Sequence, residues 1–160
     1  MSRNPLLAVA KSPVSYRMLL RSAGLVEVTE KILRRLTRNR FGVLDLVGIP
    51  SVQVLIPGRR TGVVRATTLQ CIDAQGGIFV VGSNWARPVH PAWSTNLREA
   101  KAVEVRRHND HYEAEVREVV GSDRSEAWAS ILRAWPNYEL AQRKVPGRPF
   151  RIFLLALQPS

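Results

Sequence analysis

The chain has 160 residues, the size of one domain, and 45% of them are hydrophobic, which excludes an intrinsically disordered protein. Its single cysteine, Cys71, excludes an intrachain disulfide framework and a cysteine-rich zinc site. Lys and Arg number 24 against 13 Asp and Glu, so the formal charge is +11, and a field of that sign attracts nucleic acid, acidic lipid or an anionic small molecule.

A basic arm, residues 1–40, begins the chain. It carries nine Lys and Arg against two Glu, so 9 − 2 gives +7 of the formal charge. Ser12 followed by Pro13 is typical of a helix start, and the pattern predicts a helix to about residue 21 that Gly24 ends. No apolar run approaches the roughly 18 residues of a spanning helix, and no secretory signal is visible, so we expect a cytoplasmic protein.

A second helix is predicted over 25–38, with basic residues mostly off its apolar stripe. This stripe could pack on the rest of the protein, or it could lie on the anionic inner face of a membrane. A boundary near 39–49 divides the chain into the helical arm, 1–40, and a β domain, 41–160. The stripe consists of Leu25, Val28, Ile32, Leu33 and Leu36.

After residue 48 the hydrophobic pattern becomes that of short strands joined by tight turns, one of them at Asn109-Asp110. Sequential strands of this kind favour an antiparallel barrel over a doubly wound parallel sheet. The sequence therefore predicts a mainly β fold, a six-stranded antiparallel barrel with flanking helices. The predicted strands cover 51–56, 63–72, 78–81, 102–106, 112–120 and 150–157.

Two helices are predicted within this β region. One is short and covers about 91–98. The other runs from Asp123 to Trp135, where Asp123 and Glu126 form a capping-box pattern, and Pro136 stops it. Its expected buried face comprises Ala127, Trp128, Ile131, Leu132 and Trp135.

The turn Gly58-Arg59-Arg60-Thr61-Gly62, with Arg65 after it, joins the first two predicted strands. Glycines allow left-handed backbone, turn N–H groups can form an anion-binding nest, and guanidinium groups bind phosphate or carboxylate in bidentate fashion. The alternative is a solvated turn that is merely basic. The turn lacks the Gly-Lys-Ser/Thr ending of a phosphate-binding P-loop.

Small and polar residues also follow the third predicted strand, where Ser83 and Asn84 could present donors to an anion or belong to a plain loop. Trp93 and Asn96 stand three residues apart on the short helix and would share a face, although a Trp at such a position more often belongs to the hydrophobic core.

The three histidines do not have the spacing of metal ligands, so we expect no metal site. Cys71 is predicted to be a buried, small hydrophobic residue.

Taken in order, these motifs resemble the deazaflavin-dependent nitroreductase family, whose members are actinobacterial flavin/deazaflavin oxidoreductases with a split β-barrel. The resemblance spans about residues 45–159. Each piece alone is weak, and it is the ordered set at these spacings that is specific. The pieces are Gly58-Arg-Arg-Thr-Gly62 with Arg65, Val81-Gly-Ser-Asn84, Pro88-x-His-Pro-x-Trp93-x-x-Asn96, Trp135-Pro-x-Tyr138 and Leu157-x-Pro159.

The resemblance implies an oxidoreductase that transfers a hydride from reduced deazaflavin coenzyme F-420 to an electron-poor acceptor such as a quinone, nitro compound or enone. FMN is the alternative cofactor. Tyr138 would be an active-site tyrosine near the deazaflavin and the acceptor. The resemblance also implies cofactor-binding roles: Arg59 and Arg60 at the phosphate or the acidic glutamate tail, Thr61, Gly62 and Arg65 shaping their turn, Ser83 and Asn84 along the phosphate and ribityl part, and Trp93 and Asn96 beside the cofactor.

This sequence departs from the family pattern at two places. Asn84-Trp85-Ala86 stands where relatives tend to have Lys-Gly-Gly, and Ala141 replaces a second tyrosine. Both changes put nitroimidazole activation in question.

The expected partners are a small-molecule acceptor, which the enzyme would reduce, and a membrane surface, which the basic arm would contact. The protein is expected to be a monomer or a homodimer. No nucleic acid is expected, because only Phe41 adjoins the basic runs of 25–40 and 58–65.

Overall fold

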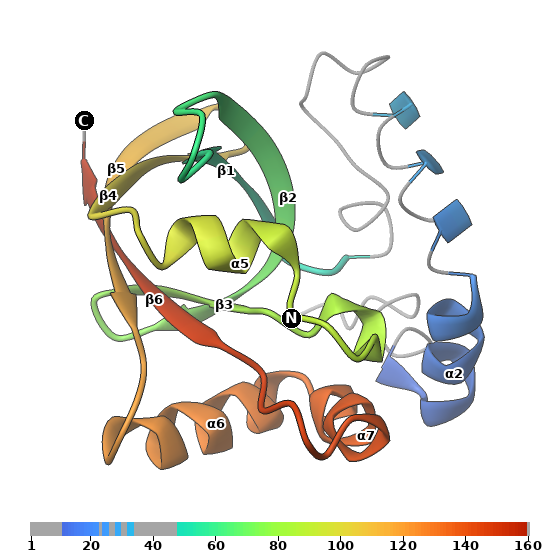
Figure 1. Ribbon diagram of the computed structural model, residues 1–160. Helices are drawn as coiled ribbons and strands as arrows, with labels where there is room; N and C mark the ends of the chain where they lie inside the picture. Colours follow the sequence, from blue (N-terminus) through green and yellow to red (C-terminus); the bar gives the residue numbers. More distant parts are fainter. Residues whose placement is uncertain (1–10, 23, 26–27, 30–31, 34–47, 160) are drawn as a thin grey trace.

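Six antiparallel strands close into a barrel in the computed structural model, which describes residues 11–22, 24–25, 28–29, 32–33 and 48–159 (Figure 1). The order around the barrel is β1-β2-β3-β6-β5-β4, and β4 pairs back with β1. The predicted fold class is therefore confirmed. The strands are β1 (Ser51–Pro57), β2 (Val64–Ala74), β3 (Gly77–Val81), β4 (Ala102–Arg107), β5 (Asp110–Glu118) and β6 (Ile152–Pro159).

Alternate residues of each strand fill the barrel interior, as the two-residue period of a strand requires. In β1 the inward side chains are Val52, Val54 and Ile56, none of them more than 2% exposed. Phe153 from β6 lies in the same core. Cys71 belongs to it as well, at 1% exposed, so its prediction as a buried small hydrophobe is confirmed.

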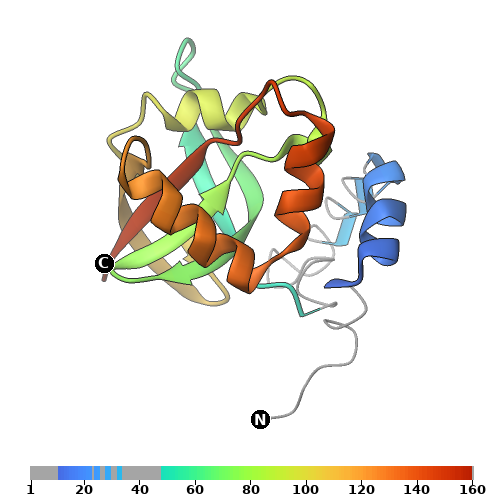
Figure 2. The ribbon, with the colours of Figure 1, turned by 90° about the horizontal axis from the view of Figure 1, so that it is seen from below.

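A second core lies between the outside of the barrel and two helices, α6 (Asp123–Ala134) and α7 (Asn137–Lys144). Val81 and Ile152 point out of the barrel into this core, where they meet Ile131 of α6. The β3 and β6 strands are thus buried on both faces. Figures 1 and 2 show α6 and α7 on the same side of the barrel.

Helix α6 lies where it was predicted, and of its expected buried face Ala127, Ile131 and Trp135 are buried, whereas Trp128 and Leu132 are half-buried. Helix α7 was not predicted, because Pro136 was interpreted only as a stop. In the structure Pro136 separates the two helices and flanks the start of α7, with a φ of −58° that suits a first helical turn.

Two local predictions were wrong in detail. Arg107 pairs with Asp110, so the β4–β5 turn is at His108-Asn109, one residue earlier than expected, and His108 takes a left-handed φ of 56°. The expected capping box is absent from α6, which has no side-chain cap bond. The Asp123 carboxylate instead accepts a hydrogen bond from Arg117 Nη1 at 2.9 Å.

Helix α2 (Pro13–Arg21) starts where predicted but ends before Gly24, which is itself helical. It contacts α7, and the Asn137 amide donates to the Lys11 carbonyl at 3.0 Å. The predicted 25–38 helix is described only in part. Among the described residues, no helix combines the length and apolarity needed to cross a bilayer.

Three described residues of the predicted stripe are exposed, whereas a fourth, Leu33, is half-buried. Leu25 is 72% exposed, Val28 55% and Ile32 54%. Leu36 and most of the predicted 39–49 boundary lie outside the described residues.

Candidate functional site

The β1–β2 turn is built by its own backbone. The Gly58 N–H donates to the Val63 carbonyl at 2.9 Å, and the Gly62 N–H donates to the Gly58 carbonyl at 2.7 Å. Gly62 has a φ of +68°, which favours glycine, and a Cβ at Gly58 would lie 2.7 Å from Thr61 Oγ1. Both glycines are therefore required, and the turn they form leaves Arg59 and its neighbours exposed.

This turn meets the short helix α5 (Ala92–Leu97), because the Arg59 N–H donates to Asn96 Oδ1 at 3.4 Å. Two of the predicted segments are thereby brought together, and Figure 2 shows the turn projecting from the barrel beside α5. Arg59, Arg60 and Arg65 are all exposed, and none of them takes part in an ion pair among the described residues. Two of these cations are on the turn and Arg65 follows it in β2, and such a group of arginines without ion pairs among the described residues fits an anionic ligand.

Trp93 and Asn96 were expected to share a face and flank a ligand, but they have different partners. The Trp93 ring is half-buried against the barrel core, 6.1 Å from the ring centroid of Phe153. Asn96 faces the β1–β2 turn. Trp93 therefore anchors α5 to the barrel, and Asn96 ties α5 to the arginines.

The segment that follows β3 carries unusual backbone. In the short 3-10 turn η1 (Asn84–Ala86), Asn84, Trp85 and Ala86 have φ values of 49°, 55° and 57°. Left-handed non-glycine residues cost about 1–3 kcal/mol each and persist only where their surroundings hold them. The Asn84 amide donates to the Val89 carbonyl at 2.8 Å, so it braces its own loop.

Arg148 is a part of the site that the sequence did not reveal. In the sequence it stands among other basic residues, Arg143, Lys144 and Arg151. In the structure it is 6% exposed and donates to the carbonyls of the segment after β3. A basic residue in a basic cluster gives no sequence signal of burial.

Tyr138 lies in the second core rather than beside the arginine turn. It is 4% exposed, its hydroxyl donates to Gln70 Oε1 at 3.2 Å, and its ring centroid lies 6.5 Å from those of Trp128 and Phe150. Its helix α7 packs against η1, and Ala86 of η1 packs on the same core. Tyr138 is thus next to the η1 segment but separated from solvent.

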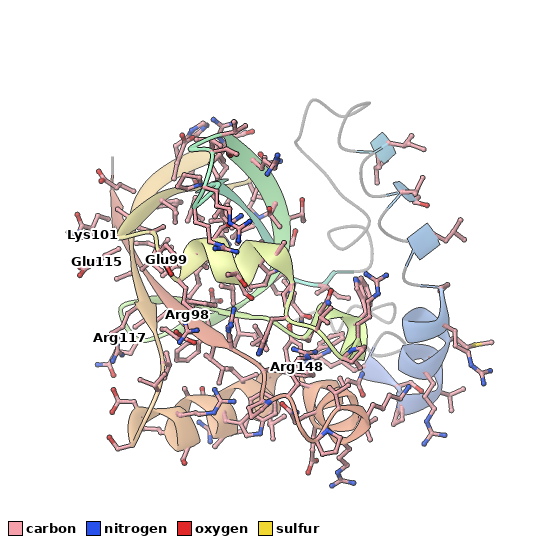
Figure 3. The ribbon with its side chains drawn as sticks, viewed as in Figure 1. Arg98, Glu99, Lys101, Glu115, Arg117 and Arg148 are labelled. Carbon is pink, nitrogen blue, oxygen red and sulfur yellow. The ribbon has the colours of Figure 1, made fainter. Side chains whose placement is uncertain are left out.

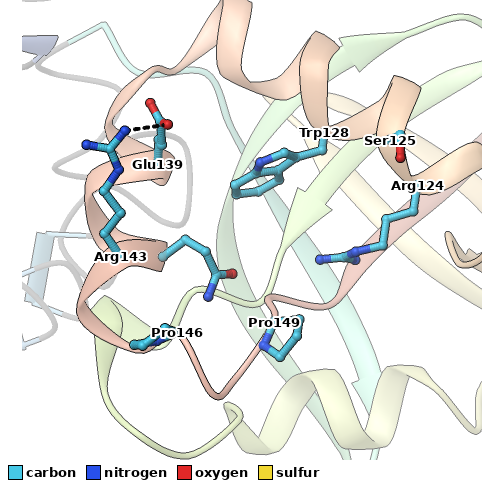
Figure 4. Close-up of a pocket in the computed structure, with 8 residues that line it drawn as sticks. Arg124, Ser125, Trp128, Glu139, Arg143, Pro146 and Pro149 are labelled. Atoms are coloured by element: carbon cyan, nitrogen blue, oxygen red, sulfur yellow. Dashed lines mark hydrogen bonds and ion pairs between the residues drawn. The ribbon is translucent and has the colours of Figure 1, made fainter.

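A cavity of about 530 Å³ opens between α6, α7 and the 146–149 loop (Figure 4). Trp128 and Arg124 point into it from α6, and Arg143 pairs with Glu139 at 2.7 Å on the opposite wall. None of the predicted site residues lines this cavity. Trp93 and Asn96 lie instead on α5, which the β1–β2 turn contacts.

Comparisons with known proteins agree with the sequence motifs. Residues 29–156 match the family described as F420H2-dependent quinone reductase. The chain belongs to this family. One similar structure is the F420-H2 dependent reductase FDR-A, at 26% identity and a TM-score of 0.60, covering 66% of this chain and 93% of the other. Another, described as a domain-swapped dimer, has 25% identity and a TM-score of 0.62, covering 84% of this chain and 98% of the other.

The family member described here is therefore an oxidoreductase with coenzyme F-420 as its cofactor. F-420 carries a phosphate and a tail of carboxylates. The exposed arginines at 59, 60 and 65, without acidic partners among the described residues, fit such a polyanion by charge. Their turn also contacts α5, so a ligand held there lies at the barrel end that α5 covers.

Proposed function

We propose that this enzyme reduces a small quinone with electrons from F-420, and that the β1–β2 turn holds the cofactor's acidic part. The observation that carries the proposal is the set of three exposed arginines, Arg59 and Arg60 on a glycine turn joined to α5 and Arg65 just after it in β2, in a chain of the quinone reductase family. The chemistry that F-420 supplies when bound is hydride donation. The protein's own tasks are to orient the cofactor, exclude water and stabilise charge on the acceptor.

Each predicted residue has a task in this proposal. Arg59 and Arg60 bind the phosphate or glutamate tail, while Thr61, Gly62 and Arg65 shape the turn. Asn96 fixes the turn to α5, and Trp93 anchors α5 on the barrel. Ser83 and Asn84 line the phosphate and ribityl part, and Tyr138 donates a hydrogen bond or proton at the acceptor. In the structure the single proton of the Tyr138 hydroxyl is donated to Gln70 Oε1, so the proposed role requires this hydrogen bond to be exchanged for one to the acceptor.

A steady-state assay tests the reductase activity. Reduced F-420 is mixed with a soluble naphthoquinone, with and without the enzyme, and cofactor oxidation is followed by absorbance. The proposal expects enzyme-dependent oxidation that saturates in both substrates, and weaker rates with a nitroimidazole acceptor. FMN added as a competitor should displace F-420 only at higher concentration. Absence of any rate above the uncatalysed one would exclude quinone reduction by this chain.

Exposed apolar residues of the arm support peripheral contact with a membrane as a second function. Val14 and Met18 of α2 are 67% and 69% exposed, and Leu25, Val28 and Ile32 continue the same helical spacing. Arg17 and Arg21 are exposed on α2 as well. Apolar and basic side chains together favour an anionic bilayer surface.

Flotation with vesicles tests this contact on the full chain. The wild type should float with vesicles that contain an anionic phospholipid and stay behind with purely zwitterionic ones. Val28→Ser with Ile32→Ser should abolish flotation and leave F-420 oxidation unchanged. Equal flotation of the wild type and this variant would show that the stripe is not the contact.

The domain-swapped dimer among its structural relatives supports a homodimer for this chain as well. Sedimentation equilibrium measures the mass directly. A mass of 18.0 kDa at micromolar concentration would contradict the dimer.

A further inference from the structure

Arg148 lies in the loop between α7 and β6, and Figure 3 shows it between the barrel and the α6–α7 pair. Its guanidinium donates through Nε to the Arg87 carbonyl at 3.0 Å. It donates through Nη1 to the Gly82 carbonyl at 3.1 Å and through Nη2 to the Ser83 carbonyl at 2.7 Å. His90 Nδ1 lies 3.5 Å from Nη1. One side chain therefore reaches both ends of the segment 82–87.

The charge of Arg148 has no acidic partner among the described residues. Burial, and to a smaller degree the charge of Arg151, lower the pKa of Arg148. A buried cation normally pairs with a carboxylate, and here backbone carbonyls take that place. A guanidinium suits this arrangement because its donors form a planar fork, whereas a lysine ammonium presents a single point charge.

The carbonyls held by Arg148 set the direction of the neighbouring N–H groups. In a trans peptide the C=O and N–H point in opposite directions. Because the Ser83 carbonyl points at Arg148, the Asn84 N–H of the same peptide points away from it. Neither the Asn84 N–H nor the Trp85 N–H donates to a carbonyl or side chain among the described residues. Ser83 is right-handed and Asn84 left-handed, the sequence of conformations of an anion-binding nest. The Ser83 N–H donates to the Val81 carbonyl at 2.9 Å, so the Asn84 and Trp85 N–H groups are the donors that remain.

The loop that carries Arg148 is itself fixed to α7. The Gln142 amide donates to the carbonyls of Val145 and Arg148, both at 3.0 Å, and its oxygen accepts from the Phe150 N–H at 2.9 Å. The Phe150 ring lies under the guanidinium, with its centroid 4.9 Å from the guanidinium carbon. Arg148 is therefore held in place by Gln142 and Phe150 on one side and by the carbonyls of the segment 82–87 on the other.

We propose that Arg148 is the positioning residue of the segment 82–87: it keeps the three carbonyls turned inward and, through the Ser83–Asn84 peptide, presents the Asn84 N–H group to an anionic oxygen of the cofactor. This rests on the proposed function, in which Ser83 and Asn84 line the phosphate of F-420. The unfavourable left-handed backbone at 84–86 is then kept by the guanidinium rather than by local preference.

The experiment compares Arg148→Lys and Arg148→Ala with the wild type in two measurements. The first is F-420 affinity from cofactor fluorescence, together with KM for F-420 and kcat. Loss of charge-assisted hydrogen bonds predicts a Kd and KM at least about tenfold higher in both variants, with kcat at saturating cofactor changed much less. The second is amide hydrogen exchange without cofactor, where exchange at 83–87 should rise while the barrel strands stay protected.

Arg124→Ala is the matched control. Arg124 is half-buried and, like Arg148, donates to a carbonyl, that of Phe150 at 2.8 Å, but it does not touch the segment 82–87. Its loss should leave the F-420 Kd and the exchange of 83–87 unchanged. An effect as large as that of Arg148→Ala would overturn the positioning role, because any disturbance of the 145–150 loop would then suffice.

The outcomes separate this proposal from the proposed function. If the wild type binds F-420 and Arg148→Lys binds it equally well with unchanged exchange at 83–87, Arg148 is not the positioning residue and the function stands. If the wild type fails to bind, the function fails, and the exchange experiment still shows whether Arg148 holds the segment. If Arg148→Ala does not fold, Arg148→Lys decides, because it keeps the charge and the aliphatic stem. Raised exchange throughout the barrel in Arg148→Lys would overturn the proposal.

Discussion

The arginines of the β1–β2 turn and Arg148 show two uses of one residue type. Arg59, Arg60 and Arg65 are exposed on or just after a turn whose shape depends on glycine, so their guanidinium groups remain available to a ligand. Arg148 is 6% exposed, and its donors are occupied by backbone carbonyls. The exposed arginines offer positive charge to a ligand, whereas the buried Arg148 holds the backbone of the segment 82–87 in its conformation. Substitutions should therefore affect the two groups differently.

The largest expected effect is on stability, from Arg148→Ala. The Gly82 and Arg87 carbonyls would lose their donor, while the Ser83 carbonyl would keep the Ala86 N–H, and an unsatisfied buried group costs about 1–3 kcal/mol. We expect the free energy of unfolding in urea to fall by about 2 kcal/mol or more. Arg59→Ala should change it by less than about 0.5 kcal/mol, since an exposed side chain is lost. An equal loss in the free energy of unfolding from the two substitutions would contradict the different roles given to the buried and the exposed arginines.

Tyr138→Phe should have the next largest effect, this time on kcat. Removing a positioned proton donor costs about 10²–10⁴-fold in rate. The same change removes the hydrogen bond to Gln70, which is worth about 1 kcal/mol of stability. Tyr112→Phe, which alters a half-buried tyrosine of β5, is the control. A stability loss in Tyr138→Phe with an unchanged kcat would restrict Tyr138 to a role in the core.

Arg59→Ala alone should weaken F-420 binding about tenfold, because a charge-assisted hydrogen bond contributes about 1.5–3 kcal/mol. Arg133→Ala removes the same charge from an exposed position on α6 and serves as the control. Fluorescence titration at one salt concentration measures both. Similar losses in the two variants would mean that net charge, rather than the β1–β2 turn, attracts the cofactor.

The smallest expected effect is a pH dependence at His90. Burial, followed by the charges of Arg151, Arg148 and Arg98, lowers the pKa of His90. The unfolded chain then binds a proton at higher pH than the native protein. The free energy of unfolding should therefore fall as pH drops below about 6.5, and level off below the native pKa.

Urea unfolding of the wild type and His90→Gln between pH 7.5 and 5 measures this effect. The variant keeps a polar side chain but cannot titrate, so titration of the other groups cancels in the difference. The wild type should lose stability relative to the variant on acidification. A relative gain of the wild type would contradict the lowered pKa.

The barrel could be predicted from sequence because its strands alternate, as Val52, Val54 and Ile56 do, and tight turns separate them. The buried face of α6 followed from helical spacing in the same way. Helix α7 was missed because Pro136 ends one helix and flanks the next, and the two cases look alike in sequence.

The details of the site were less accessible to sequence. The Arg59–Asn96 contact joins residues 37 apart, which no local pattern can reveal. The left-handed backbone at Asn84 and Trp85 carries no glycine to mark it. Arg148 depends on burial, which a charge count does not show.

Titration of F-420 fluorescence with the wild type and the double variant Arg59→Ala/Arg60→Ala, at low salt and at about 0.5 M salt, tests the central claim most directly. Binding to cations weakens as salt screens them. We predict saturable binding by the wild type that weakens with salt, and binding by the double variant that is at least about a hundredfold weaker at low salt and depends less on salt. Wild-type affinity in the double variant, or no saturable binding by the wild type, would contradict it.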